Sequence, residues 1–197
     1  MKQLFMRTKF YLILFLTGIA FVNTNAQAPA NDDCSGATLI NTVPFGVACS
    51  ASVSASTLNA TTSLPAPSCL AAPDDDIWYR FTANSSSIIF RYSNARNTAT
   101  GSQTSPSFAF YQGNCPATTA TFFCQAVNVS GDGYRIINGL TPGDTYYLRL
   151  WSLSASITMT IDFCIQDVPA PAANDHCAGA QPVATLAPGS ACTSPTA

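Results

Sequence analysis

The stretch GLTPGDTYYLRLW, residues 139–151, joins a tight turn to a run of alternating side chains. Proline fixes the backbone at the start of such a turn, and glycine supplies the positive φ that completes it. The spacing from leucine to tyrosine is that of a tyrosine corner, in which a tyrosine hydroxyl bonds the backbone a few residues upstream at a sandwich edge. The stretch predicts a structural corner followed by a strand, with the corner formed by Leu140, Pro142, Gly143 and Tyr146.

Short runs with the two-residue alternation of a strand recur along the chain, and none shows a convincing helical period. They cover 77–83, 86–93, 107–113, 121–127, 134–139 and 156–165, with two less regular runs near 38–48 and 50–57. Together with the strand at 145–151, they give eight or nine short strands separated by turn residues. This pattern predicts an all-β fold, an antiparallel β-sandwich of jelly-roll or Ig-like type.

Alternation also assigns the strand residues to two faces. In 77–81 and 146–151 the arginines share a face that is opposite the main apolar residues. Because arginine is more often exposed than buried, we expect the arginine-bearing face to point outward. Exposed aromatic rings can stack on sugars, so this face is a candidate glycan-binding surface. Its members are Trp78, Arg80, Tyr147, Arg149 and Trp151; the alternative is that a loop covers them as a peripheral core.

The N-terminus has the pattern of a secretory signal peptide over residues 1–26. Three cations precede an apolar run at 10–22, and small residues stand before Gln27. This run is shorter than the ~20 residues that a membrane-spanning helix needs, so we expect no membrane span after its removal. The remaining chain has five arginines, ten aspartates and no lysine or glutamate, a net charge of −5. This acidic balance argues against a nucleic-acid partner.

All eight cysteines follow the leader, as expected of a secreted or outer-surface protein with disulfides. A metal cluster is disfavoured because the chain has no CxxC motif and His176 is its one histidine. Six of the cysteines lie in 27–165, and the spacing alone leaves 15 possible pairings open.

The opening PANDDCSGA (29–37) recurs as AANDHCAGA at 172–180, a displacement of 143 residues that is typical of domains. A proline-rich stretch at 166–173 reads as a linker between the two copies. We therefore expect one β-sandwich module at 27–165 and the start of a second, incomplete repeat at 174–197. Cys177 and Cys192 would then lack partners within this chain, giving free thiols or disulfide-linked dimers.

Candidate catalytic residues are scarce. Residues 27–165 contain neither the histidine nor the lysine that Ser–His or Cys–His chemistry needs as a base. The carboxylate clusters are Asp32–Asp33 and the triplet Asp74, Asp75 and Asp76, both beside proline-containing turns. Their first interpretation is a solvated turn or strand cap. Calcium coordination by the triplet is the second, and acid–base catalysis the third. We expect no enzyme within this segment.

The segments PANDDC, DDIWYRFTA, FYQGNCPATTATFFC, GLTPGDTYYLRLW and DFCI follow one another in this order. In this the chain resembles the pre-peptidase C-terminal-like domains and the tandem PANDxC modules of exported bacterial surface proteins, which often end in a type IX secretion sorting domain. The resemblance implies a non-catalytic sandwich, either strung in arrays or appended to secreted hydrolases. Family members frequently carry an acidic cluster after the cysteine equivalent to Cys124, where this chain has Asp132 alone.

The resemblance further implies three disulfides, Cys34–Cys164, Cys49–Cys69 and Cys115–Cys124. With the leader, it favours an extracellular or cell-surface module for adhesion or for binding polysaccharide, cell-surface glycan or another substrate, with neighbouring repeats as further partners. The alternative is an accessory domain that targets a secreted peptidase or glycosidase whose catalytic domain lies outside this chain. Calcium is the one cofactor that these residues suggest.

Overall fold

The computed structural model describes residues 26–50, 52–67, 73–115, 121–127 and 131–169. Nearly all of the expected leader and the expected second opening, with Cys177 and Cys192, lie outside these residues, so those expectations stay predictions. Within the described residues, no helix is long and apolar enough to cross a membrane.

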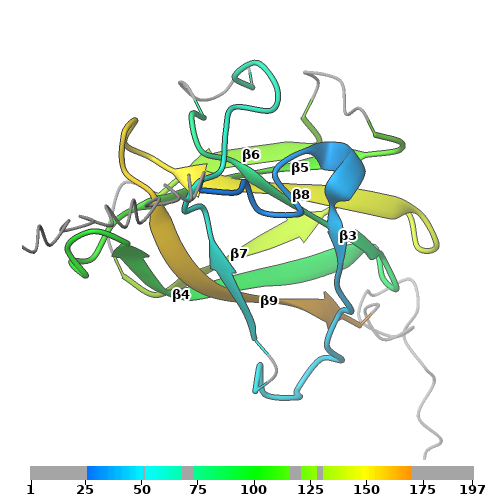
Figure 1. Ribbon diagram of the computed structural model, residues 1–197. Helices are drawn as coiled ribbons and strands as arrows, with labels where there is room; N and C mark the ends of the chain where they lie inside the picture. The colour runs from blue at the N-terminus through cyan, green and yellow to red at the C-terminus, as the bar shows by residue number, and fades with distance from the viewer. Residues whose placement is uncertain (1–25, 51, 68–72, 116–120, 128–130, 170–197) are drawn as a thin grey trace, which may run out of the picture.

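The described chain forms two β-sheets stacked as two layers (Figure 1). One sheet has the strand order β1-β3-β8-β5-β6 and the other β2-β9-β4-β7. The strands are β1 (Thr38–Leu39), β2 (Val53–Ser56), β3 (Ile77–Thr82), β4 (Ser87–Asn97), β5 (Pro106–Gln112), β6 (Phe123–Ala126), β7 (Gly133–Asn138), β8 (Thr145–Ser152) and β9 (Met159–Val168). A short 3-10 turn, η1 (Cys34–Gly36), precedes them.

The strand order is that of a jelly roll. From β2 onward the chain changes sheet at every connection except β5–β6, so β2-β9-β4-β7 faces β3-β8-β5-β6. All pairs between these eight strands are antiparallel, and β1 adds a short parallel pair at the edge beside β3. The all-β sandwich expected from the sequence is confirmed, and the jelly-roll alternative describes its topology.

The main core lies between the sheets and is rich in aromatic rings. Phe90 on β4 lies near its centre, with ring centroids 4.6 Å from Phe108 and 5.8 Å from Phe163. The inward residues of β3 and β8 follow the predicted alternation, since Ile77, Tyr79, Phe81, Tyr146, Leu148 and Leu150 all belong to this core. A strand pair that buries alternate residues in this way fixes its own register, because a shift by one residue would turn them outward.

The corner before β8 has the geometry that its sequence predicts. The Tyr146 hydroxyl accepts a hydrogen bond from the backbone N–H of Thr141 at 2.9 Å. Gly143 has a φ of +91° and donates its N–H to the carbonyl of Ala83 at 2.8 Å. The corner therefore links the entry to β8 with the end of β3.

The C-terminal boundary of the module differs from the expected one. β9 continues to Val168, which pairs with Ser87 on β4, and Gln166 is buried. The first residues of the expected linker at 166–173 thus belong to the sandwich. Proline and alanine after the strand are easily read in the sequence, but pairing with a distant strand is not.

Two disulfides attach the N-terminal region to the sandwich, and their pairings correct those that the resemblance implied. Cys34 bonds Cys115 and Cys49 bonds Cys164, with Cα–Cα distances of 5.8 and 6.0 Å. Cys34 packs on the outer side of the five-stranded sheet, whereas Cys164 lies on the outer side of β9 in the other sheet. The two are on opposite outer faces of the sandwich, so they cannot bond. The pairings Cys34–Cys164, Cys49–Cys69 and Cys115–Cys124 are therefore wrong; Cys124 is also disulfide-bonded, and Cys69 lies outside the described residues.

Candidate binding site

The face expected to bind glycans is covered in the structure. Trp78, Arg149 and Trp151 have no solvent exposure and Tyr147 retains 9%, so Arg80 alone of the five predicted residues is exposed. The alternation was right, because these residues do lie opposite the main core. The expected exposure was wrong and the alternative, a covered peripheral core, is right, because a second layer of chain packs over these residues. The three aromatic residues of this face form a peripheral core together with Cys34, Ala37, Ala109 and Tyr111.

Arg149 is at the centre of this peripheral core and is fully paired. Its Nε lies 2.9 Å from Asp76 Oδ2, and both side chains have zero exposure. Its terminal nitrogens donate to the carbonyls of Leu64 and Pro65 at 2.6 and 2.9 Å. The rings of Trp78 and Trp151 lie 5.4 and 5.6 Å from its Cζ. These contacts compensate for removing the guanidinium from water, which explains why it is inside.

The opening PANDDC forms part of the cover. Trp78 donates its backbone N–H to the carbonyl of Asn31 at 2.8 Å, and the Asn31 amide donates to the Trp78 carbonyl at 3.1 Å. The Asp32 carboxylate accepts hydrogen bonds from the backbone and hydroxyl of Thr61 at 2.6 and 2.7 Å. This segment and the one around Leu64 therefore hold each other against the sheet.

The aspartate triplet does not form a shared metal centre. The Asp74 carboxylate accepts from the Ser156 N–H at 2.6 Å and Asp75 accepts from the Thr57 hydroxyl at 2.6 Å, whereas Asp76 faces Arg149. Within the described ranges, no group of three or more histidine, cysteine or acidic residues could hold a metal ion. The second interpretation of the triplet, a calcium site made by all three aspartates, is therefore corrected, because Asp76 pairs with Arg149 while Asp74 and Asp75 bond other partners.

Asp75 is nevertheless an unusual carboxyl group. Burial raises its pKa from 3.8 to about 7, the neighbouring Asp74 adds to the rise, and the hydrogen bond from Thr57 opposes it. The Oδ1 atoms of both aspartates are buried without a hydrogen-bond partner. Neither of these two aspartates lines the groove described next.

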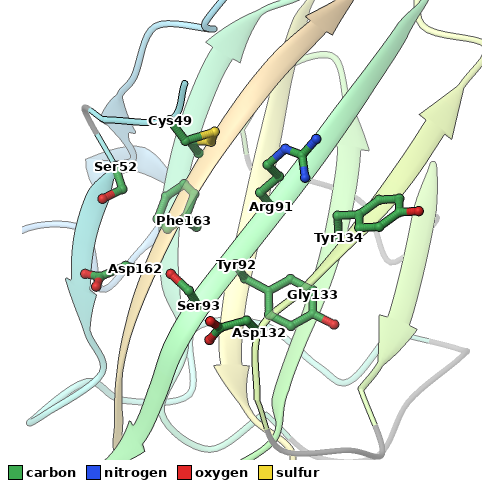
Figure 2. Close-up of a pocket in the computed structure, with 11 residues that line it drawn as sticks. Cys49, Ser52, Arg91, Tyr92, Ser93, Asp132, Gly133, Tyr134, Asp162 and Phe163 are labelled. Atoms are coloured by element: carbon green, nitrogen blue, oxygen red, sulfur yellow. A yellow bond between two sulfur atoms is a disulfide. The ribbon is translucent and has the colours of Figure 1, made fainter. Parts of the chain in front are cut away.

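The open site is on the opposite sheet. A groove of about 400 Å³ lies on the outer face of β9, β4 and β7 (Figure 2). Its floor is built from the outward residues of these strands, and its ends from the loops before β2 and β7. The lining residues are Cys49, Ser52, Arg91, Tyr92, Ser93, Asp132, Gly133, Tyr134, Asp162, Phe163 and Cys164.

One end of the groove pairs a cation with an aromatic ring. Arg91 and Tyr134 are register partners on β4 and β7, and the Arg91 Cζ lies 5.4 Å from the centroid of the Tyr134 ring. Tyr134 is 53% exposed. Arg91 Nε donates to Gln166 Oε1 at 2.6 Å, and the Gln166 amide donates to the carbonyl of Val47 at 2.6 Å. This short chain of hydrogen bonds holds the Arg91 side chain, and strand pairing places Tyr134 beside it.

The other end of the groove is acidic. Asp162 accepts hydrogen bonds from the Ser54 hydroxyl at 2.6 Å and the Asn94 amide at 2.8 Å. These bonds lower its pKa, the one from Ser54 contributing most. Asp132 accepts from the backbone N–H of Asn94 at 3.0 Å through one oxygen. The groove thus offers donors at one end, acceptors at the other and an aromatic face beside the donors.

The sequence contained a signal for this site that alternation alone did not single out. In β7 the large apolar residues that point away from the core are Tyr134 and Ile136, and both are 53% exposed. Large apolar side chains at outward positions of an edge strand suggest a contact surface. The cation that completes the site, Arg91, comes from another strand, so only the fold brings the two together.

No family model matches the chain, and no curated protein matches it. Among solved structures, it is similar to the pre-peptidase C-terminal domain of a collagenase from Bacillus anthracis, with 14% identity over 66% of this chain and 94% of that one, at a TM-score of 0.38. It is also similar to the CBM22-1 xylan-binding domain of Xyn10C from Paenibacillus barcinonensis, with 17% identity over 60% of this chain and 65% of that one, at a TM-score of 0.27. Both structures are β-sandwich modules, as this chain is.

Proposed function

We propose that this chain is a non-catalytic carbohydrate-binding module of a secreted protein, and that polysaccharide binds in the groove on the outer face of β9, β4 and β7. The observation that carries this proposal is the exposed ring of Tyr134 at the edge of an open groove with hydrogen-bonding groups on its floor. Sugar rings have apolar faces that pack on aromatic side chains, and their hydroxyls need both donors and acceptors. The groove supplies all three.

The chemistry of the groove supports binding without catalysis. Two of its groups, Asp132 and Asp162, are carboxylates such as glycoside hydrolysis uses. That reaction needs one carboxyl group to keep a proton near neutral pH. The pKa of Asp162 is instead lowered by its hydrogen bonds, so it stays ionised. Asp162 therefore does not suit the role of general acid.

Secretion is part of the same proposal. The two disulfides close loops of 81 and 115 residues and therefore bind distant parts of the chain. Such bonds form and persist in oxidising compartments outside the cytosol. They support an extracellular or outer-surface location, as does the leader pattern at 1–26.

Retention in native affinity gels that contain individual soluble polysaccharides tests the function. We expect the protein to be retarded by at least one of them, and Tyr134→Ala to weaken the apparent affinity about tenfold, because it removes the aromatic platform. Leu39→Ala is the matched control, since Leu39 is also exposed, at 61%, but lies on β1 of the other sheet. A folded Tyr134→Ala protein with unchanged retention in every gel would contradict the proposal.

A further inference from the structure

We propose that the groove selects acidic polysaccharides and that Arg91 binds the carboxylate of a uronic acid residue. This inference rests on the proposed carbohydrate-binding function and deepens it by naming the substrate class. It rests on the hydrogen bonding of the Arg91 guanidinium. Its Nε is bonded to Gln166, whereas its two terminal nitrogens have no partner among the described residues.

The terminal nitrogens of Arg91 are unpartnered within the described part of the chain. Among the described residues, the Arg91 side chain makes one hydrogen bond, from Nε to Gln166. Nη1 and Nη2 are therefore available to a ligand. Arg149–Asp76 is the ion pair found among the described residues. No carboxylate there therefore forms an ion pair with Arg91. Two other arginines differ, because exposed Arg96 and half-buried Arg135 each donate a terminal nitrogen to a backbone carbonyl.

The guanidinium is also pre-oriented. Gln166 holds Nε through its carbonyl oxygen, and is itself held through its amide by the Val47 carbonyl. Tyr134 lies beside the planar group at 5.4 Å. Arg91 is exposed, and its side chain is one of those that line the groove (Figure 2). A fixed planar fork with two free N–H groups matches the two oxygens of a carboxylate, which it can bind in a bidentate way.

Arg91 is reachable along the sheet from two sides. Besides the groove, it lines an adjoining hollow of about 360 Å³ with Phe45, Val47 and Gln166. Phe45 and Val47 are 58% and 49% exposed, which adds apolar surface on the far side of the arginine. A polymer can therefore pass across Arg91 with sugar units on both sides of it.

The two aspartates of the groove do not bind the Arg91 guanidinium in place of a ligand. Asp162 pairs in register with Ser93, two residues along β4 from Arg91, which is about 7 Å away at the usual rise of a strand. Both of its oxygens already accept hydrogen bonds, from Ser54 and Asn94. The free oxygen of Asp132 suits a sugar hydroxyl at that end. The separation of charge orients an acidic sugar with its carboxylate toward Arg91.

The test uses one polymer with and without its charge. Polygalacturonate and its fully methyl-esterified form have the same backbone, and binding of the full chain to each is measured by isothermal titration calorimetry. We expect wild type to bind the acidic form about tenfold more tightly or better, the value of a charge-assisted contact. Arg91→Gln should remove this preference by lowering the affinity for the acidic form to that for the ester. Arg80→Gln, which removes an exposed arginine from the other sheet, should leave it unchanged.

The outcomes separate the two proposals. Equal affinity for both polymers, still sensitive to Tyr134→Ala, would overturn acid selection and leave carbohydrate binding standing. A preference for the acidic form that survives Arg91→Gln would overturn the role of Arg91. Equally tight, Arg91-dependent binding to polyglutamate would show a general anion site and overturn selection of a sugar. Failure to bind these or any other polysaccharide would overturn both proposals.

Discussion

The guanidinium of Arg149 lies 2.9 Å from the Asp76 carboxylate, and neither side chain has any exposure to solvent. The two residues come from different segments that the fold brings together over the outer face of β8. Both residues also bond the covering segment, because Asp76 accepts from the Ser63 N–H and Arg149 donates to the carbonyls of Leu64 and Pro65, so the pair ties the covering layer to the sandwich.

Breaking this pair should be costly. Arg149→Met leaves the Asp76 carboxylate buried without its cation and frees two backbone carbonyls, so we expect a loss of about 3–5 kcal/mol in the free energy of unfolding. Urea denaturation followed by tryptophan fluorescence measures it. Arg80→Met on the neighbouring strand is exposed and should change stability by less than about 0.5 kcal/mol. Equal effects of the two substitutions would show that the buried pair has no special role.

Asp75 should make stability depend on pH in an uncommon direction. Because its folded pKa is raised to about 7 from 3.8, the folded state keeps a proton that the unfolded chain releases between these values. Stability is therefore highest near the lower value, falls as pH rises through this window, and is level above it. Urea midpoints measured at several pH values should show this fall in wild type.

The variant Asp75→Asn should flatten that curve, whereas Asp33→Asn, at an exposed position, should keep it. Asp162 does not interfere, because its lowered pKa places its own effect below the window and with the opposite sign. A wild-type curve that rises with pH across the window would contradict the prediction.

The tyrosine corner should contribute a single buried hydrogen bond. Tyr146→Phe removes the acceptor of the Thr141 N–H and nothing else, so we expect a loss of about 0.5–1.5 kcal/mol. Thermal or urea unfolding measures it, and Tyr134→Phe on the exposed edge is the matched control. If both substitutions have the same effect, the corner hydrogen bond is not stabilising.

The disulfide pairing can be read directly by proteolysis without reduction and mass spectrometry of the linked peptides. We expect links Cys34–Cys115 and Cys49–Cys164. The second closes 115 residues, and chain-entropy reasoning assigns such a closure about 4–5 kcal/mol. Replacing both Cys49 and Cys164 with alanine should therefore lower stability by an amount of this order. A peptide linking Cys34 to Cys164 would contradict the described arrangement.

Local patterns in the sequence predicted most of the fold. The alternation in β3 and β8 assigned Tyr79 and Leu148 to the core, and the spacing around Pro142 placed the corner. What failed depended on distant partners. Arg149 was expected outside because arginine usually is, yet Asp76, 73 residues away, supplies its counter-charge. The cysteine pairs failed for the same reason, since order along the chain does not say which face of which sheet a cysteine occupies.

The groove illustrates the same limit. Tyr134 is readable as an unusually apolar outward residue, but its neighbour Arg91 lies 43 positions earlier and meets it only through the β4–β7 pairing. No short motif contains both. Sequence alone could therefore propose a binding module, but it put the candidate surface on a face that the structure shows to be buried.

Successive residues of β4 point to opposite faces of the sheet. Arg91 faces the groove, while Phe90 and Tyr92 on either side of it fill the core. The same division holds on β7, where Tyr134 and Ile137 point to opposite sides of the sheet. Substitutions at every second position of these strands can thus change the groove while the core residues stay the same.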